Sequence, residues 1–380
     1  MRMTFASNFF NHHQSPFSEA MAARCDYTFV ETEEMDAERT GMGWGLSDIP
    51  KYVKNLAADE VASRATIDGA DVVIIGSAPD KLMERRLKEK KLTFRYAERF
   101  YKEAPPQTRA LRNRLAAWLH HGRFQKYPLY MLCASAYTAA DCAWSVNYKD
   151  RCYKWGYFPE AKRHDADALM AGKAKETPAI LWAARFIDWK HPEAAVLTAE
   201  RLKRDGYDFE MTLIGSGDLA DAVREMIQDK GLEDCVHLTG AMKPEQVRTH
   251  MERGDIFLAT SDRNEGWGAV VNEAMNSGCA VVASHAMGSV PYLMKQEENG
   301  LIFRSGDWDD LYEKTKRLMD DPPLRERLGR AACRTIAEEW NAGVAAERFL
   351  RLAEALRAGE DTPFANGPFS KAELFESDWL

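Results

Sequence analysis

The sequence predicts an α/β protein made of two doubly wound domains, and three observations predict it. The chain has 380 residues, which is more than one hydrophobic core usually fills and suits two domains. In the second half, short apolar runs alternate with stretches of helical periodicity, as parallel β-α units require. The first half shows the same alternation less regularly. Two such sheets facing each other are expected to hold a ligand between the carboxyl ends of their strands.

The second half gives the clearer pattern of elements. We expect strands at 179–186, 209–214, 236–239, 256–260, 280–284 and 300–303. The helices predicted between and after them span 192–204, 219–230, 244–253, 269–276, 290–297, 308–320, 323–339 and 344–357.

In the first half, strands are expected at 3–6, 27–30, 71–75, 93–96 and 129–133, and helices at 17–23, 53–64, 81–90 and 108–120. The polar stretch 162–178 contains Gly172 and Pro178 and predicts a linker between the domains. We therefore expect an acceptor-binding domain over 1–170 and a donor-binding domain over 171–343. A final helix and tail over 344–380 are expected to cross back to the first domain.

Composition excludes several classes of protein. Hydrophobic residues make up 45% of the chain, an ordinary globular value, and no run of eighteen apolar residues predicts a membrane span. The first residues are too polar and too few to predict a signal peptide. The seven cysteines form no Cys-x-x-Cys pair, so neither a zinc site nor a disulfide framework is indicated. A reducing cytoplasm is the expected location.

Positive charge is concentrated in residues 81–126. This stretch holds fourteen basic and four acidic residues, a net charge of +10 in a chain whose net charge is −8. Such a patch can contact an anionic membrane surface, an anionic acceptor or nucleic acid, and it can equally be a solvated helix face. The acidity of the whole chain weighs against nucleic acid. We expect peripheral contact with the inner face of an anionic membrane.

A pair of glutamates carries the strongest functional signal. A polar loop follows the strand at 256–260 and ends in Glu265, Gly266, Trp267 and Gly268, and Glu273 lies inside the helix that begins next. The glycines allow a ligand to approach the backbone, and the free N–H groups at the helix start favour a phosphate. Carboxylates accept hydrogen bonds from paired sugar hydroxyls. The alternative is a capping Glu and a second Glu on a solvated face.

These residues resemble the donor domain of retaining family 4 glycosyltransferases, whose GT-B architecture has two Rossmann-like domains facing across a cleft. Their signature places two glutamates with seven residues between them, with Phe where this chain has Trp267. Further segments match in order: 184–186 with Lys190, 213–217, 238–240 and 278–283. The resemblance covers roughly residues 175–350.

The resemblance implies a set of roles. Arg185 and Lys190 grip the donor diphosphate, Glu265 contacts the transferred sugar and Glu273 holds the ribose. Gly266 and Trp267 belong to the donor-binding loop. The N–H groups of Gly268, Ala269 and Val270 meet the phosphates, and Gly215 belongs to the glycine turn of the donor site. The segment 241–242, with Met242, lies beside the base. From the residues alone, two cations at a strand's carboxyl end suit phosphate oxygens equally well.

Two other kinds of site are weighed against this one. Residues 215–220 read Gly-Ser-Gly-Asp-Leu-Ala after a strand, which formally fits a nicotinamide-cofactor fingerprint. That turn follows the second strand of its domain, however, and no acidic strand end comes about 20 residues later. No metal site is predicted and no cofactor is expected, because the basic pair and the helix start can neutralise a diphosphate.

The acceptor side departs from the family pattern. The first strand is followed by residues 8–16, with His12 and His13, where the family has a glycine pair. One of these histidines is expected to act in the site, His13 as a catalytic candidate, although adjacent turn histidines are often plain surface residues. Glu98 and Arg99 are further acceptor candidates. The aromatic stretch 155–159 suits either a sugar or packing between the domains.

The resemblance thus implies a retaining, metal-independent glycosyltransferase that moves a hexose, by front-face displacement, from a nucleoside diphosphate sugar to a glycan or lipid-linked acceptor. The alternatives are a sugar-nucleotide-binding protein without transferase activity and a sugar-nucleotide epimerase on the same fold.

Overall fold

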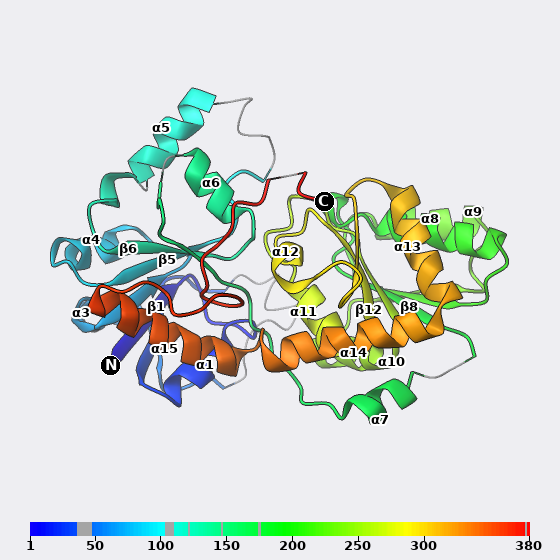
Figure 1. Cartoon of the computed structure of the whole chain (residues 1–380), viewed down its shortest axis with the longest axis horizontal. Helices are drawn as coiled ribbons and strands as arrows, with labels where there is room; N and C mark the ends of the chain where they lie inside the picture. Colours follow the sequence, from blue (N-terminus) through cyan, green and yellow to red (C-terminus); the bar gives the residue numbers. More distant parts are fainter. Residues whose placement is uncertain (36–47, 103–109, 121, 146, 174–175, 377) are drawn as a thin grey trace. The chain divides into compact units, whose positions relative to one another are not determined.

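The computed structural model describes the whole chain except residues 36–47, 103–109, 121, 146, 174–175 and 377 (Figure 1). The described residues form two compact units. The first contains residues 1–160 and 340–379, and the second contains 161–339 together with the last residue.

The first unit is built on a parallel sheet with the strand order β3-β2-β1-β4-β5-β6-β7. Its strands are β1 (Arg2–Ser7), β2 (Asp26–Glu31), β3 (Val53–Asn55), β4 (Val72–Ile75), β5 (Thr93–Ala97), β6 (Leu129–Cys133) and β7 (Cys152–Lys154). The helices are α1 (Ser15–Ala22), α3 (Glu60–Gly69), α4 (Lys81–Lys88), α5 (Ala110–His120), α6 (Thr138–Trp144) and α15 (Ala342–Ala358), with a 3-10 turn η2 (Gly122–Phe124).

The second unit has a parallel sheet with the order β10-β9-β8-β11-β12-β13. Its strands are β8 (Ala179–Ala183), β9 (Glu210–Ile214), β10 (Val236–Gly240), β11 (Ile256–Ala259), β12 (Ala280–Ser284) and β13 (Leu301–Phe303). Its helices are α7 (Ala166–Ala171), α8 (Pro192–Arg204), α9 (Ala220–Asp229), α10 (Pro244–Arg253), α11 (Ala269–Asn276), α12 (Val290–Leu293), α13 (Trp308–Asp320) and α14 (Pro322–Glu338), and η3 (Asp188–Lys190) is a 3-10 turn.

The central strands explain why both sheets form. Every residue of β4 and of β12 is buried, and both strands are rich in valine and isoleucine or alanine. Strands covered by helices on both faces need such continuous apolar runs, and β-branched residues favour extended backbone. The predicted fold class, α/β with two doubly wound parallel sheets, is therefore confirmed.

Two predicted elements are wrong in detail. The helix expected at 53–64 is instead the short strand β3 followed by α3, which starts at Glu60 behind the capping side chain of Asp59. The stretch 162–178, expected to be an irregular linker, contains α7 and belongs to the second unit. Lys173 explains that attachment, because its buried ammonium donates to the carbonyl oxygen of Met251 at 2.8 Å.

The end of the chain completes the first unit. Phe349 of α15 is fully buried, and its ring centroid lies 5.2 Å from that of Phe94 on β5 and 5.5 Å from that of Phe369. Trp155 and Phe158 of the aromatic stretch 155–159 are buried in the same unit. Those two rings therefore serve as core of the first unit, whereas Tyr157 stays partly exposed.

No helix in the described part of the chain is long and apolar enough to cross a membrane.

Candidate functional site

The candidate site of the second unit lies where its strand order reverses. The first strand of the unit, β8, has β9 on one side and the fourth strand, β11, on the other. The loops after β8 and β11 therefore leave the sheet in opposite directions, which creates the crevice in which open α/β sheets bind ligands. Four of the sequence-predicted residues, Arg185, Lys190, Glu265 and Gly268, come from these two loops.

Lys190 and Glu265 meet in this crevice. Lys190 ends η3, and its ammonium contacts the Glu265 carboxylate in an ion pair whose side chains are both 14% exposed. Because these residues are 75 positions apart in sequence, only the fold brings them together. The sequence predicted that both belong to one site, and the structure gives them a direct contact.

Thr260 connects the loop after β11 to the loop after β8 through its hydroxyl group. This buried residue follows β11, and its hydroxyl accepts a hydrogen bond from the Trp182 indole at 2.8 Å. The same hydroxyl donates to the carbonyl oxygen of Lys190 at 2.6 Å. A second tie runs from the N–H of Asp262 to the carbonyl oxygen of Trp189 at 2.9 Å. The position of Lys190 is thus fixed through its backbone, and the sequence gave no indication of Thr260.

Of the two predicted diphosphate-binding cations, Arg185 and Lys190, Arg185 is the more exposed. It follows β8, and its guanidinium lies 5.7 Å from the ring centroid of Trp189. A guanidinium stacked on an aromatic face keeps its N–H groups in a plane and available for a bidentate acceptor.

The glycine turn after β9 supports the loop that carries Arg185. A Cβ at Gly215 (φ +145°) would lie 1.8 Å from the carbonyl oxygen of Ala184, and one at Gly217 (φ +150°) would lie 2.5 Å from that of Phe186. The Phe186 N–H donates to the Ser216 carbonyl at 2.8 Å. These glycines are thus explained by close packing of two backbones. The nicotinamide fingerprint is not needed to account for them.

The start of α11 has free backbone donors. Gly268 precedes the helix with φ +87°, and no side chain caps it. Ala269 and Val270 form the first turn and are partly exposed. The N–H groups of such a turn, together with the helix dipole, suit an anion.

Trp267 departs from its predicted role. Its side chain is fully buried, and its indole N–H donates to the Asn272 side chain at 2.8 Å. The ring is therefore part of the core of the second unit. Gly266 is buried beside it.

Glu273 lies one turn into α11 and is partly exposed. Loss of water around its carboxyl group raises the pKa of Glu273, and the positive charge of Arg248 on α10 acts in the opposite direction. Arg248 is buried and donates to the Asn276 side chain at 2.5 Å. Met242, expected beside a base, is partly exposed after the turn at Gly240.

The first unit brings together three of the four acceptor-side candidates. The rings of His12 and His13 are 3.9 Å apart, and His13 stacks on Tyr157 with 6.0 Å between centroids. The Tyr157 hydroxyl donates to Glu98 at 2.6 Å. Arg99 is buried instead, with its guanidinium 4.6 Å from the Tyr137 ring centroid. Arg99 is therefore mainly a packed residue of the first unit.

His13 is uncharged near neutral pH. Burial, and then the neighbouring His12, lower the pKa of His13 to about 3. A neutral imidazole presents one donor and one acceptor nitrogen, as general bases and hydroxyl-binding groups require.

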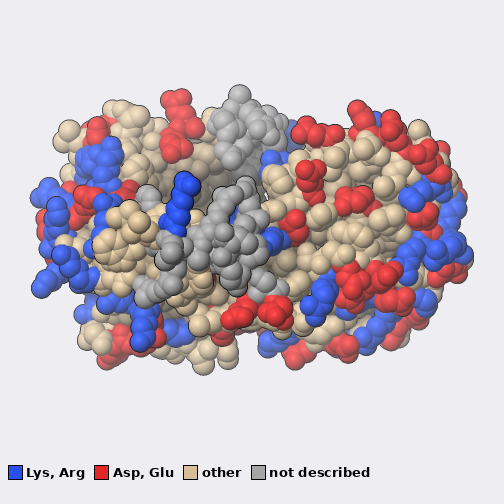
Figure 2. Space-filling view, turned by 90° about the horizontal axis from the view of Figure 1, so that it is seen from above, with Lys and Arg blue, Asp and Glu red and all other residues tan. Residues whose placement is uncertain are grey.

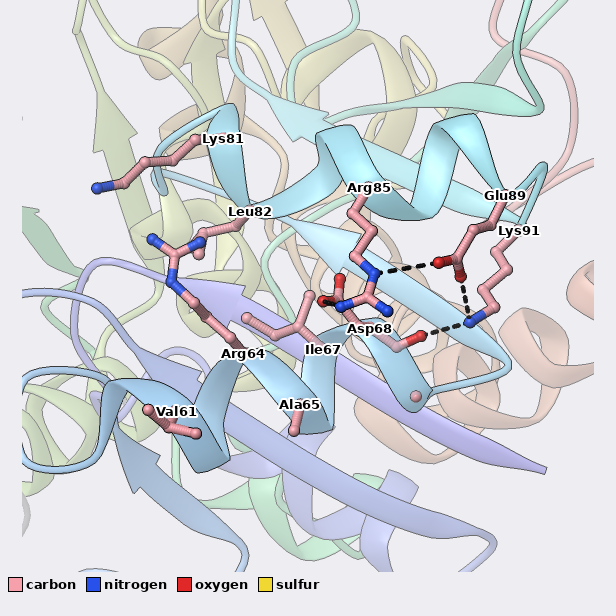
Figure 3. A pocket seen from close by; sticks show the side chains of 11 residues that line it. Val61, Arg64, Ala65, Ile67, Asp68, Lys81, Leu82, Arg85, Glu89 and Lys91 are labelled. Carbon is pink, nitrogen blue, oxygen red and sulfur yellow. Dashed lines mark hydrogen bonds and ion pairs between the residues drawn. The ribbon is translucent and has the colours of Figure 1, made fainter.

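A groove lies elsewhere in the first unit, between α3 and α4 (Figure 3). It encloses about 680 Å³, and four of its charged residues, Asp68, Arg85, Glu89 and Lys91, pair among themselves. Arg85 binds Glu89 at 3.1 Å and Asp68 at 3.4 Å, and Lys91 binds Glu89 at 2.8 Å. The described residues contain no cluster of three or more His, Cys, Asp or Glu side chains suited to a metal ion.

The basic stretch 81–126 is divided by the fold. Arg86 is fully buried and donates to the carbonyl oxygens of Ile67 and Ala70 at 2.7 Å each, so it is a structural residue. Exposed cations remain on α4 and around α5, namely Lys81, Arg85, Lys88, Lys90, Arg112, Arg123 and Lys126. Figure 2 shows basic side chains, with acidic ones among them, on the part of the surface at the left of the view. Next to these cations, α5 exposes Leu115, Trp118 and Leu119 by 59%, 53% and 54%.

The fold and the β8/β11 crevice define the second unit as a ligand-binding doubly wound domain. Comparison with known proteins gives its family. Residues 169–335 match the family model described as "Glycosyl transferases group 1", and this stretch of the chain belongs to that family.

Curated relatives agree with this assignment. The chain is 31% identical over 182 residues to "Amylovoran biosynthesis glycosyltransferase AmsK" of Erwinia amylovora, covering 47% of this chain and 44% of that protein. It is 26% identical over 211 residues to "Alpha-D-kanosaminyltransferase" of Streptomyces kanamyceticus, covering 53% and 54%. The matched stretch thus spans about half the length of these relatives.

Solved structures extend the likeness in fold to the whole chain. Anabaena Alr3699/HepE, solved in complex with UDP, covers 94% of this chain and all of its own at 15% identity, with a TM-score of 0.68. Sucrose-phosphate synthase from Thermosynechococcus elongatus covers 95% at 14% identity, with a TM-score of 0.67. The fold is that of GT-B glycosyltransferases, as the resemblance implied.

Proposed function

We propose that the chain is a retaining glycosyltransferase of family 4 that moves a hexose from a nucleoside diphosphate sugar to a glycan or a lipid-linked acceptor. The contact between Lys190 and Glu265, in the β8/β11 crevice of a group 1 domain, carries the proposal. It sets a cation for the leaving diphosphate beside a carboxylate for the transferred sugar. These are the two parts of a donor that separate during transfer.

The remaining donor groups extend from this pair. Arg185 joins Lys190 on the diphosphate, whose other oxygens meet the N–H groups at Gly268, Ala269 and Val270. Glu273 accepts hydrogen bonds from the ribose hydroxyls. The turn at Gly215 and the segment with Met242 lie beside the nucleoside.

The transfer needs no protein nucleophile in this proposal. The bond between the anomeric carbon and the diphosphate oxygen breaks while the acceptor hydroxyl attacks from the same face of the sugar. The proton of that hydroxyl passes to the departing phosphate oxygen. Arg185 and Lys190 stabilise the negative charge that grows on the leaving group, so neither a metal ion nor another cofactor is required.

On the acceptor side, we propose that the first unit binds the hydroxyl groups of the acceptor. His12, His13 and Glu98 offer neighbouring donors and acceptors, with Tyr157 as an aromatic surface. His13, as an imidazole placed between His12 and Tyr157, is the catalytic candidate among them. Arg99 contributes charge from within the packed unit.

The names of two relatives bear on the class of acceptor. They describe amylovoran biosynthesis in Erwinia amylovora and lipopolysaccharide core biosynthesis in Rhizobium meliloti. A role in polysaccharide biosynthesis is consistent with these names. We propose that the protein works in the cytoplasm at the inner face of the membrane, to which the cations of α4 and the exposed apolar residues of α5 bind.

Two variants test the donor site. Replacing Lys190 by Ala, or Glu273 by Ala, is expected to lower kcat/KM for the donor at least tenfold, about 1.4 kcal/mol of transition-state stabilisation. The matched controls are Lys203→Ala, whose ammonium pairs with Asp234 at the surface, and Glu225→Ala on the exposed face of α9. Unchanged kinetics in both site variants would contradict the proposal.

The two alternatives predict different products. A binding protein without transferase activity raises its melting temperature with UDP, GDP or ADP sugars but transfers to no acceptor extract. An epimerase converts the sugar nucleotide without an added acceptor, which product analysis detects.

A further inference from the structure

We propose that His191 is a positioning residue that clamps the diphosphate loop after β8 to the sugar loop after β11. This inference rests on the proposed donor site and adds a residue to it. His191 is adjacent to Lys190 in sequence, but no role follows for it from the sequence pattern or from the comparisons.

The contacts of the ring define the clamp. Nδ1 lies 2.8 Å from a carboxylate oxygen of Glu193, in the first turn of α8. Nε2 lies 3.4 Å from a carboxylate oxygen of Asp262, in the loop after β11. The ring also packs on Trp308 of α13, with 5.3 Å between centroids. The side chain of His191, the residue after Lys190, therefore contacts α8, the β11 loop and α13.

Two carboxylates at the two ring nitrogens require two N–H groups. A neutral imidazole has one N–H, so one of its nitrogens would face a carboxylate with a lone pair. The complete clamp is therefore made by the imidazolium form. Burial and the positive end of α8 oppose this charge, but the two carboxylates outweigh them, and the pKa of His191 is raised, with Glu193 the largest cause.

The helix α13 also packs against the His191 ring, and the side chain with which it does so is the uncharged indole of Trp308. The neighbouring Lys190 is turned to Glu265. Within the loop, the backbone N–H of His191 donates to the carbonyl oxygen of Asp188 at 3.2 Å. Glu193 and Asp262 are thus the charged groups that face the ring.

The backbone of His191 has an unusual conformation for a histidine. Its φ of +51° and ψ of +57° are left-handed, a conformation that glycine and asparagine adopt more readily than histidine. A proline follows at position 192, which disfavours the ordinary helical conformation for the residue before it. Because the position suits glycine or asparagine sterically, the ring can be removed without straining the loop.

The direction of the pH dependence follows from the raised pKa. The clamp is complete below the ordinary histidine pKa of about 6.5 and is lost as the pH rises through the higher pKa of the folded protein. If the clamp holds Lys190 in place, diphosphate affinity falls over the same range. The change appears in Kd and KM, and kcat changes less.

The experiment compares wild type with His191→Asn and His191→Gly. UDP is the first probe, with GDP and ADP in parallel, and Kd is measured by calorimetry from pH 6 to pH 9. At pH 6 we expect at least fivefold weaker binding by either variant, and the ratio of variant to wild-type Kd should approach one by pH 9. Because the nucleotide titrates equally in both measurements, the ratio of the two Kd values at each pH is free of the effect of that titration.

Controls separate positioning from general structure. His237→Asn removes an exposed histidine of β10 that pairs with the exposed Glu210 of β9 at 2.6 Å, and it should leave Kd at wild-type values throughout. Asp262→Asn should reproduce the pH profile of His191→Asn. An NMR titration, with the His191 signal assigned by its loss in His191→Asn, should give a pKa above 6.5.

The outcomes are distinct. If wild type binds UDP, GDP or ADP and the His191 variants show the same Kd and pH profile, the clamp is wrong while the proposed function stands. If wild type binds none of the three nucleotides, the proposed function itself fails.

Discussion

At the scale of single residues, the site combines chemistry that the sequence indicated with contacts that only the structure supplies. Glu265 and Lys190 could be predicted because carboxylates and cations at strand ends suit sugars and phosphates. Thr260 and His191 could not, because a threonine after a strand and a histidine before a proline have no pattern of their own. Trp267 was assigned to the donor from its place in the motif, yet its ring belongs to the core.

His13 allows a residue-scale prediction about stability. Its pKa is lowered to about 3 from an ordinary 6.5, so between these values the unfolded chain binds a proton that the native state does not. Stability should therefore fall as the pH drops below 6.5, with a slope from this group of at most about 1.4 kcal/mol per pH unit. Urea unfolding at several pH values measures it.

The comparison variant is His13→Gln, which removes the titrating group. Its stability should fall less steeply than wild type between pH 6.5 and pH 4. Parallel slopes for the two proteins would show that His13 titrates normally.

At the scale of elements, α5 is the helix whose surface is least typical of a globular protein. Leu115, Trp118 and Leu119 are three and four residues apart on one face and are exposed by more than half. Arg112 and Arg123 flank them, and Arg123 reaches Asp80 at 3.5 Å and Glu84 at 3.6 Å on α4. In such an arrangement the apolar face can enter the interface of a lipid bilayer while the cations contact anionic headgroups.

We therefore expect α5 to contribute to vesicle binding. Replacing Leu115, Trp118 and Leu119 together by Ser should reduce binding to anionic vesicles at least fivefold in a sedimentation assay, and added salt should weaken wild-type binding. Leu374→Ser, which alters another exposed leucine, is the matched control. Equal binding of wild type to neutral and anionic vesicles, or no effect of the triple change, would contradict this role.

Elements were predicted best where periodicity and burial coincide. The helix at 192–204 and the strand at 280–284 match the structure to the residue, because the helix has apolar positions at a clear helical period and the strand is a short, continuously buried run. The region 53–64 was misread because β3 has only three residues and gives no alternation. In α7, six residues with one buried side chain are too few for a helical period.

At the scale of the whole molecule, the second unit is continuous in sequence apart from the last residue, whereas the first is made of two long segments. Residues 340–379 belong to the first unit, where Phe349 packs between Phe94 and Phe369. The sequence predicted a tail that crosses back. It could not give the packing partners, since aromatic contacts between residues 94 and 349 depend on the folded chain.

The packing of Phe349 predicts how its loss affects the stability of each unit. Phe349→Ala should cost about 3–5 kcal/mol, because it empties a fully buried ring site. In hydrogen exchange, amide protection should fall in β1 and β5 and persist in β8 and β11. The reciprocal control is Phe303→Ala on β13, which is also fully buried and should lower protection in the second unit instead. Equal losses in both units for each variant would show that they unfold together.

The return of residues 340–379 to the first unit also bears on how the protein is made. During synthesis, residues 1–160 leave the ribosome first, but α15 and the rings at 349 and 369 follow only after the second unit has been translated. The second unit has all its strands as soon as residue 339 emerges, so it can fold as a contiguous domain. The sheet of the first unit therefore receives its final packing partner only after the second unit has been translated, although its strands are synthesised before that unit.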